Sequence, residues 1–134
     1  MKRTSEAGVA AVEFAILLPI LMVIVFGIIE FSLALYNREV ITNASREGAR
    51  AGIVQAVPRP TITNIQSVVN TYLTNALSTA GAATVTVPSG SCAAFGNDLT
   101  VRVDFPYSFQ VLPGLIGGLV GDITLSAITT MRCE

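Results

Sequence analysis

The sequence predicts an α+β fold in which a long N-terminal helix precedes a small domain of one helix packed on a three- or four-stranded antiparallel sheet. Three observations predict it. An uncharged apolar run covers 14–29, and apolar residues recur every three or four positions in 61–80. Later in the chain, two segments alternate apolar with polar residues and a third is long and rich in β-branched residues. An amphipathic helix followed by alternating strands is most simply arranged as one layer on another.

Composition narrows the possible functions. Of the 134 residues 51% are hydrophobic and 13% are charged, with eight Lys or Arg against nine Asp or Glu and no His. A near-neutral chain has no electrostatic footprint for nucleic acid. The sequence also has no GxSxG turn, phosphate-binding glycine loop or metal-ligand spacing. We therefore expect no enzyme activity, catalytic residue, metal site or cofactor, and neither nucleic acid nor a small-molecule substrate as a partner.

The apolar run is long enough to cross a membrane. It extends past Glu30 to Tyr36, which gives 23 residues and a helix of roughly 35 Å. Lys2 and Arg3 precede it, and the positive-inside rule places that basic end in the cytoplasm. We therefore predict a transmembrane helix at 9–36 with the rest of the chain outside the cytoplasm.

The helix is expected to continue beyond the membrane. Residues 37–56 form an amphipathic extension, so that one helix runs from Val9 to about Val54. Pro19 removes a backbone hydrogen bond and should kink the apolar half. Gly27 is either a soft point or a place where another helix approaches closely.

Residues 57–134 are predicted to form the extracytoplasmic α+β domain. Its helix covers 61–80, with Thr61 or Thr63 as N-cap and Gly81 as C-cap. The expected strands are 84–87, 99–105 and 123–131. Pro106 should end or bend the second strand, with 107–112 as its continuation and 113–122 as an apolar glycine-rich loop.

Cys92 and Cys133 are the two cysteines of the chain. In an oxidising compartment they most simply form one disulfide, which would tie the end of the last strand to the loop before the central one. Two free buried thiols are the alternative.

Two acids flank the apolar run, and each requires an explanation. An isolated carboxylate at the bilayer centre costs roughly 2.5–3.5 kcal/mol on insertion scales. Glu13 lies at the start of the run and Glu30 near its outer boundary. For Glu30 we consider a helix-to-helix contact and solvation among lipid headgroups equally.

The stretch GVAAVEFAILLPILMVIVFGIIEFSLALYNREVITNASREGAR, from Gly8 to Arg50, resembles the N-terminus of TadE-like proteins. These are pilin-like subunits of the tight-adherence (Tad, Flp-type) branch of type IV pilus systems. The resemblance rests on a glycine followed by small residues, Glu13-Phe14, a proline in the apolar helix, the FGIIEF segment, and the final SREGAR. It covers about a third of the chain.

The resemblance implies processing by a prepilin peptidase between Gly8 and Val9, with 1–8 as the leader peptide. Glu13, followed by Phe14, then becomes the fifth residue and can pair with the free α-amino group of a neighbouring subunit. The chain is larger than the short major subunit, which implies a minor pilin or pseudopilin acting in pilus assembly and surface adherence.

The implied partners are the prepilin peptidase, inner-membrane pilus assembly proteins, other pilin-like subunits and the membrane. The implied location is the bacterial inner membrane, with a single pass and later incorporation into the extracellular pilus as one outcome. Two alternatives stay open. A signal peptidase acting near Ser32-Leu33-Ala34 would release a secreted soluble domain that starts near Leu35. An unprocessed chain that starts at Met1 would be a single-pass envelope protein that never polymerises.

Overall fold

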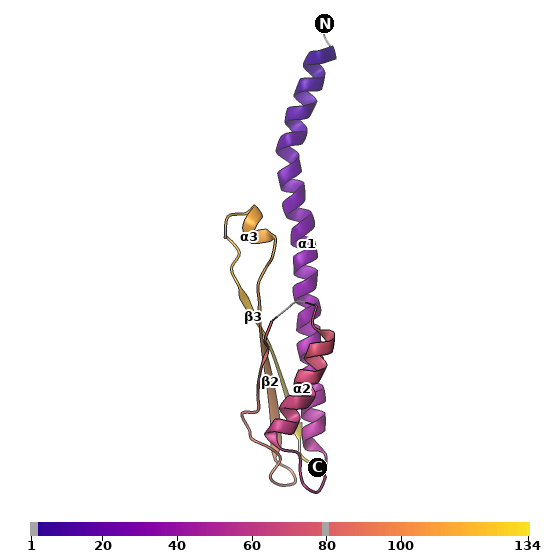
Figure 1. Ribbon diagram of the computed structural model, residues 1–134, viewed down its shortest axis with the longest axis vertical. Helices are drawn as coiled ribbons and strands as arrows, with labels where there is room; N and C mark the ends of the chain where they lie inside the picture. Colours follow the sequence, from indigo (N-terminus) through magenta and orange to yellow (C-terminus); the bar gives the residue numbers. More distant parts are fainter. Residues whose placement is uncertain (1–2, 79–80) are drawn as a thin grey trace. The chain divides into compact units, whose positions relative to one another are not determined.

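The computed structural model describes residues 3–78 and 81–134 (Figure 1). In chain order its elements are α1 (Arg3–Ile53), α2 (Ile62–Ala76), β1 (Thr84–Thr86), β2 (Asp98–Tyr107), α3 (Leu112–Leu115) and β3 (Ile123–Arg132). The predicted α+β fold, with a long apolar helix followed by an antiparallel sheet, is confirmed.

Contacts divide the chain into two compact units, which are described separately. The anchor unit consists of α1 up to Ser32 together with Phe109–Gly121, and the sheet unit consists of Leu33–Ser108 with Asp122–Glu134. The contacts therefore divide α1 after Ser32, whereas the segments 9–36, 37–56 and 57–134 remain sequence-based predictions.

In the anchor unit, α1 is one continuous helix that begins before the expected Val9. Pro19 lies inside it, and the kink predicted there stays a prediction. The helix is long and apolar enough to cross a membrane, and none of its most apolar stretch is buried within the protein. The first two residues of the predicted leader, including Lys2, lie outside the described part of the chain.

The sheet unit contains three antiparallel strands in the order β1-β2-β3. Val103 of β2 pairs with Val85 of β1 on one side and with Ala127 of β3 on the other. Alternate β2 side chains are buried, as the period of two in the sequence predicts. The buried set is Leu99, Val101, Val103, Phe105 and Tyr107.

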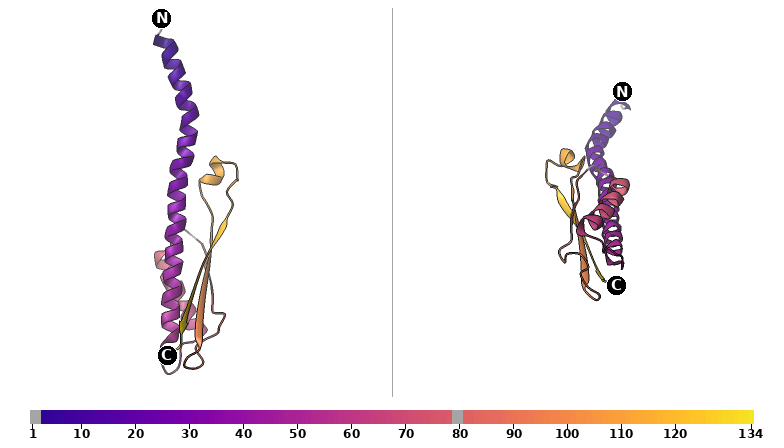
Figure 2. Two further views of the ribbon diagram at one scale, coloured as in Figure 1. Left: turned by 180° about the vertical axis from the view of Figure 1, so that it is seen from behind. Right: turned by 60° about the horizontal axis from the view of Figure 1, so that its bottom comes forward.

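Two helices pack on the buried face of the sheet, whereas the sequence predicts one. They are α2 and the C-terminal part of α1. Figure 2 shows α2 and the C-terminal part of α1 beside the strands. Ile65, Val69 and Leu73 of α2 are buried. Gly48 of α1 lies so close to α2 that an added β-carbon would be 2.3 Å from Cγ2 of Val69. The predicted amphipathic extension thus supplies a core helix.

Buried polar side chains of α1 hydrogen-bond to the elements that α1 packs against. Oδ1 of Asn37 accepts from the amide and hydroxyl of Ser78 at 3.2 and 2.9 Å. The hydroxyls of Ser45 and Thr129 are 2.7 Å apart. Because buried polar groups cost free energy when they are unpaired, these bonds favour this arrangement of α1.

The end of α2 differs from the prediction. Thr61 is the N-cap and accepts from the amide of Asn64 at 3.3 Å, but the helix stops at Ala76 because Leu77 is extended. Gly81 is therefore not the C-cap, and residues 79 and 80 lie outside the described chain. Gly81 serves packing instead, since an added β-carbon would lie 2.6 Å from Cε2 of Phe105.

The strand boundaries also need correction. β2 passes through Pro106, which pairs with Thr124, and ends at Tyr107. A proline is tolerated there because β1 reaches only Asp104, so β2 has one neighbouring strand at that point. The predicted continuation at 107–112 is therefore present only at Tyr107, and residues 108–112 do not extend the strand. The expected loop at 113–122 contains most of a short helix, α3, which begins at Leu112.

Cys92 and Cys133 form the predicted disulfide, with Cα atoms 5.8 Å apart, and the alternative of two free thiols is wrong. The bond joins residues 41 positions apart. The chain-entropy relation gives an upper estimate of about 4 kcal/mol for a loop of this length. The amide of Cys133 also donates to the carbonyl of Asn97 at 2.7 Å, so the end of the sheet is fixed by two kinds of bond.

Replacing Gly48 with Val should destabilise the sheet unit by about 2 kcal/mol, because its side chain would overlap Val69. The chain has three tyrosines and no tryptophan. All three tyrosines, at 36, 72 and 107, lie in the sheet unit. Urea unfolding of the detergent-solubilised protein, followed by tyrosine fluorescence, therefore reports this unit alone. Gly27→Ala is the matched control, since its β-carbon would lie 3.9 Å from Leu112. Equal midpoints for the two variants would contradict the packing argument.

Candidate functional site

The predicted processing and assembly residues lie together at the start of α1. Gly8 has open space around it, with nothing within 4 Å of an added β-carbon. Val9 and Phe14 are 58% and 62% exposed. Glu13 is exposed as well, one helical turn after Val9, and the structure shows no hydrogen bond or ion pair for it among the described residues. An exposed carboxylate thus lies on a surface that is otherwise apolar.

Glu30 is in a very different environment, because it is only 4% exposed. Its Oε1 accepts from the amides of Gln110 and Val111 at 2.7 and 2.5 Å, and its Oε2 accepts from the amide of Leu112 at 3.2 Å. Charge-assisted hydrogen bonds of this kind are stronger than neutral ones and offset the desolvation of a buried carboxylate. Glu30 therefore fixes the start of α3 within the anchor unit.

The segment bound by Glu30 contains a short helix that is followed by a glycine turn. α3 begins at Leu112 with Pro113 in its first turn, where a missing amide proton costs nothing. Gly117 and Gly118 then take φ values of 65° and 78°, which glycine adopts without strain. The chain can thus turn back toward β3 within a few residues.

Gly27 lies one turn before Glu30, and Leu112 is its neighbour. A β-carbon added at Gly27 would lie 3.9 Å from Cδ2 of Leu112, which is ordinary van der Waals contact. The contact between α1 and Leu112 therefore does not require a glycine at position 27. A close approach by another helix at Gly27 stays a prediction.

Sequence reasoning did not identify the partner of Glu30. The sequence predicts a loop at 113–122 and leaves two environments open for Glu30, a helix contact and headgroup solvation. The available signals were an acid in an apolar helix and an uncharged stretch, Phe109–Gly121, some 80 positions away. Neither signal indicates that Glu30 and Phe109–Gly121 lie close together, because a contact between residues so far apart in the sequence depends on tertiary structure.

The clearest charged pair lies on the exposed face of the sheet. Nε of Arg102 donates to Asp104 at 2.7 Å, and the hydroxyl of Ser126 donates to the same carboxylate at 2.5 Å. The hydrogen bond from Arg102, followed by that from Ser126, lowers the pKa of Asp104, and the same pair raises the pKa of Arg102. The associated stability is present above the ordinary pKa of Asp and is lost as the pH falls through the lowered value. Solvent screening keeps it small.

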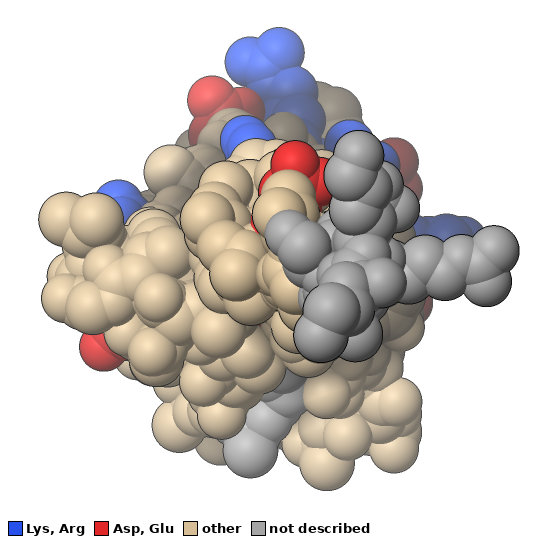
Figure 3. All heavy atoms as spheres, turned by 90° about the horizontal axis from the view of Figure 1, so that it is seen from above, with Lys and Arg blue, Asp and Glu red and all other residues tan. Residues whose placement is uncertain are grey.

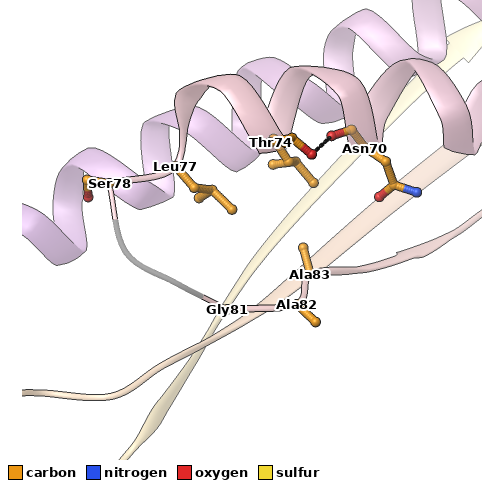
Figure 4. Close-up of a pocket in the computed structure, with 8 residues that line it drawn as sticks. Asn70, Thr74, Leu77, Ser78, Gly81, Ala82 and Ala83 are labelled. Carbon is orange, nitrogen blue, oxygen red and sulfur yellow. Dashed lines mark hydrogen bonds between the residues drawn. The ribbon is translucent and has the colours of Figure 1, made fainter.

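A hollow of about 510 Å³ lies between α2 and residues 81–83 (Figure 4). Its lining is uncharged, and the hydroxyl of Thr74 is already bonded to the carbonyl of Asn70 at 2.8 Å. Within 3–78 and 81–134 there is also no group of three His, Cys, Asp or Glu side chains placed to hold a metal. The candidate functional residues are therefore Glu13 and Glu30 of α1, together with the segment Phe109–Gly121 to which Glu30 is hydrogen-bonded.

Comparison with known proteins bears on this helix. Residues 8–50 match the family of TadE-like proteins. This chain carries a TadE-like domain. The match confirms the resemblance, covers about a third of the chain and includes Gly8, Glu13 and Glu30. TadE-like proteins are pilin-like and generally non-enzymatic structural proteins. No curated protein and no solved structure gives a significant match to the chain.

Replacing Glu30 with Ala should expose the amides of Gln110, Val111 and Leu112 to exchange. Loss of hydrogen bonds to a charged acceptor is worth about 2 kcal/mol, or roughly thirtyfold faster exchange. Hydrogen–deuterium exchange of the detergent-solubilised protein measures this. Glu39→Ala removes an exposed carboxylate from the same helix and should leave these amides unchanged. Equal exchange in both variants would show that Glu30 does not hold the segment.

Proposed function

We propose that this protein is a minor pilin or pseudopilin of a Tad pilus system, acting in pilus assembly and surface adherence. The observation that carries the proposal is the exposed carboxylate of Glu13 on an apolar helix surface inside a TadE-like domain. Such a surface needs lipid around it before assembly and other helices around it afterwards.

Cleavage between Gly8 and Val9 by a prepilin peptidase gives that carboxylate a partner. It removes Lys2 and Arg3 and creates a positive α-amino group on Val9. In a water-poor filament core, the ammonium of one subunit and Glu13 of another offset each other's desolvation if their geometry is good. A shifted register would leave both charges unpaired, so the pair selects alignment.

The location proposed is the bacterial inner membrane, with the N-terminus in the cytoplasm and the sheet unit outside. Two features support it: α1 has the length and composition of a membrane span, and the Cys92–Cys133 disulfide is typical of an oxidising compartment. The proposed partners are the prepilin peptidase, inner-membrane assembly proteins and other pilin-like subunits.

Glu30 argues against release by a signal peptidase. A cut near Leu35 would remove this residue, and the amides of Gln110, Val111 and Leu112 would lose their acceptor. The same cut would leave Phe109–Gly121 without the rest of its compact unit. The anchor unit is complete only if the apolar helix stays in the mature protein.

Mass spectrometry of the protein purified from membranes should find Val9 as the mature N-terminus. A start near Leu35 would instead support secretion, and a start at Met1 would support a plain membrane anchor. Either of these results would overturn the proposed processing. A strain without the prepilin peptidase is the control, and it should accumulate the chain that still carries residues 1–8.

Replacing Glu13 with Ala should leave membrane insertion intact and reduce incorporation into the pilus machinery. An unpaired buried ammonium costs roughly 2.5–3.5 kcal/mol, which corresponds to about a hundredfold loss of incorporation. Quantitative immunoblotting of membranes and sheared pili measures both quantities. Glu47→Ala, which removes an exposed acid later in α1, is the matched control. Normal assembly and adherence of the Glu13→Ala strain would exclude the proposed charge pair.

A further inference from the structure

The segment Phe109–Gly121 is unusual for a connection between two strands of a polar-faced sheet. It contains no Lys, Arg, Asp or Glu. It presents large apolar side chains to its surroundings, with Leu115 43% and Leu119 86% exposed. Gly117 and Gly118, both with positive φ, immediately precede Leu119, so the most exposed leucine directly follows a turn.

This segment packs with the apolar part of α1 in one compact unit. Glu30 binds its backbone, and Leu112 lies beside Gly27. The exposed surface of α1 at the same level is also apolar, with Ile28 and Phe31 64% and 60% exposed. Figure 3, seen from the end that carries the N-terminus, likewise shows mostly uncharged residues over the described part of that face.

We propose that Phe109–Gly121 is a second membrane-contacting element, which inserts Leu115 and Leu119 among lipid acyl chains at the outer boundary of the bilayer. The inference rests on the proposed function to the extent that α1 spans the membrane. The occupant is lipid, because the segment continues the surface of the same unit that α1 exposes and offers no charge to a polar partner.

The Glu30 contact supplies the physical condition for such a placement. Backbone amides near the hydrocarbon region lack water and need acceptors inside the protein. A carboxylate on an apolar helix near the same boundary needs donors. The three amides of Gln110, Val111 and Leu112 and the carboxylate of Glu30 meet both needs at once. Glu30 is therefore a positioning residue for the segment.

The chain has no tryptophan, so a single introduced tryptophan reports one position. Full-length protein is reconstituted into phosphatidylethanolamine–phosphatidylglycerol vesicles, with or without brominated acyl chains, as three variants. Leu119→Trp tests the segment. Ile24→Trp, in the apolar stretch of α1, is the positive control, and Ile128→Trp, on the sheet and 60% exposed, is the negative control.

We expect the tryptophan at position 119 to emit at short wavelength and to be quenched by brominated lipid nearly as strongly as the one at position 24, while the one at position 128 is not quenched. Quenching at 24 but not at 119 would overturn the inference and leave the membrane span intact. Blue-shifted but unquenched emission at 119 would indicate a protein neighbour and would also overturn it. Absence of quenching at 24 would count against the span, and so against both proposals.

The role of Glu30 is tested by combining Leu119→Trp with Glu30→Gln. The amide is close in size but lacks the charge and one acceptor oxygen, so the tryptophan should lose most of its quenching. Ile24→Trp in the same background should keep its quenching, which shows that the helix is still inserted. Glu39→Gln is the matched control and should change neither reporter. Full quenching at 119 in the Glu30→Gln background would refute the positioning role.

Discussion

A carboxylate on an apolar helix must find hydrogen-bond donors or remain in water, and the two acids of α1 follow different routes. Glu30 is buried and accepts from three consecutive amides of its own chain. Glu13 is exposed, and the described residues offer it no donor. The first acid is paired within the anchor unit, whereas the second is exposed and has no partner among the described residues. The proposed function rests on this difference.

The core of the sheet unit is small and is formed by side chains from α1, α2 and the three strands. Its three strands cannot cover their own apolar face, and α2 alone is short. The C-terminal part of α1 completes the core, where Gly48 and Gly52 allow side chains from α2 and β2 to approach the helix backbone. The disulfide then fixes the opposite end of the chain to the loop before β2. Helix, sheet and covalent bond thus act on one core.

Periodicity was enough to predict most of this architecture. The bounds expected for the long helix, α2 and the three strands lie within a few residues of those observed. The repeats of α2 and β2 match their burial, whereas the first half of α1 follows from an uncharged apolar run and β3 from its β-branched residues. The errors occurred where tertiary packing decides. α2 stops at Ala76 although its pattern continues, β2 tolerates Pro106 because a neighbouring strand is missing there, and α3 is too short to have a period. The roles proposed for Gly8 and Glu13 come from the resemblance to TadE-like proteins. The partner of Glu30 lies some 80 residues away along the chain, so no local sequence pattern predicts it.

The close approach at Gly48 has an evolutionary consequence. The family match ends at residue 50, within the helix that forms part of the sheet unit's core, so the boundary of sequence similarity runs through a folded unit. The region beyond the match is therefore constrained by the helix against which it packs. Any replacement for α2 must bring a side chain no larger than Val69 against this glycine, or the helix residue must change with it. Paired substitutions at positions 48 and 69 are the trace that such a constraint leaves in related sequences.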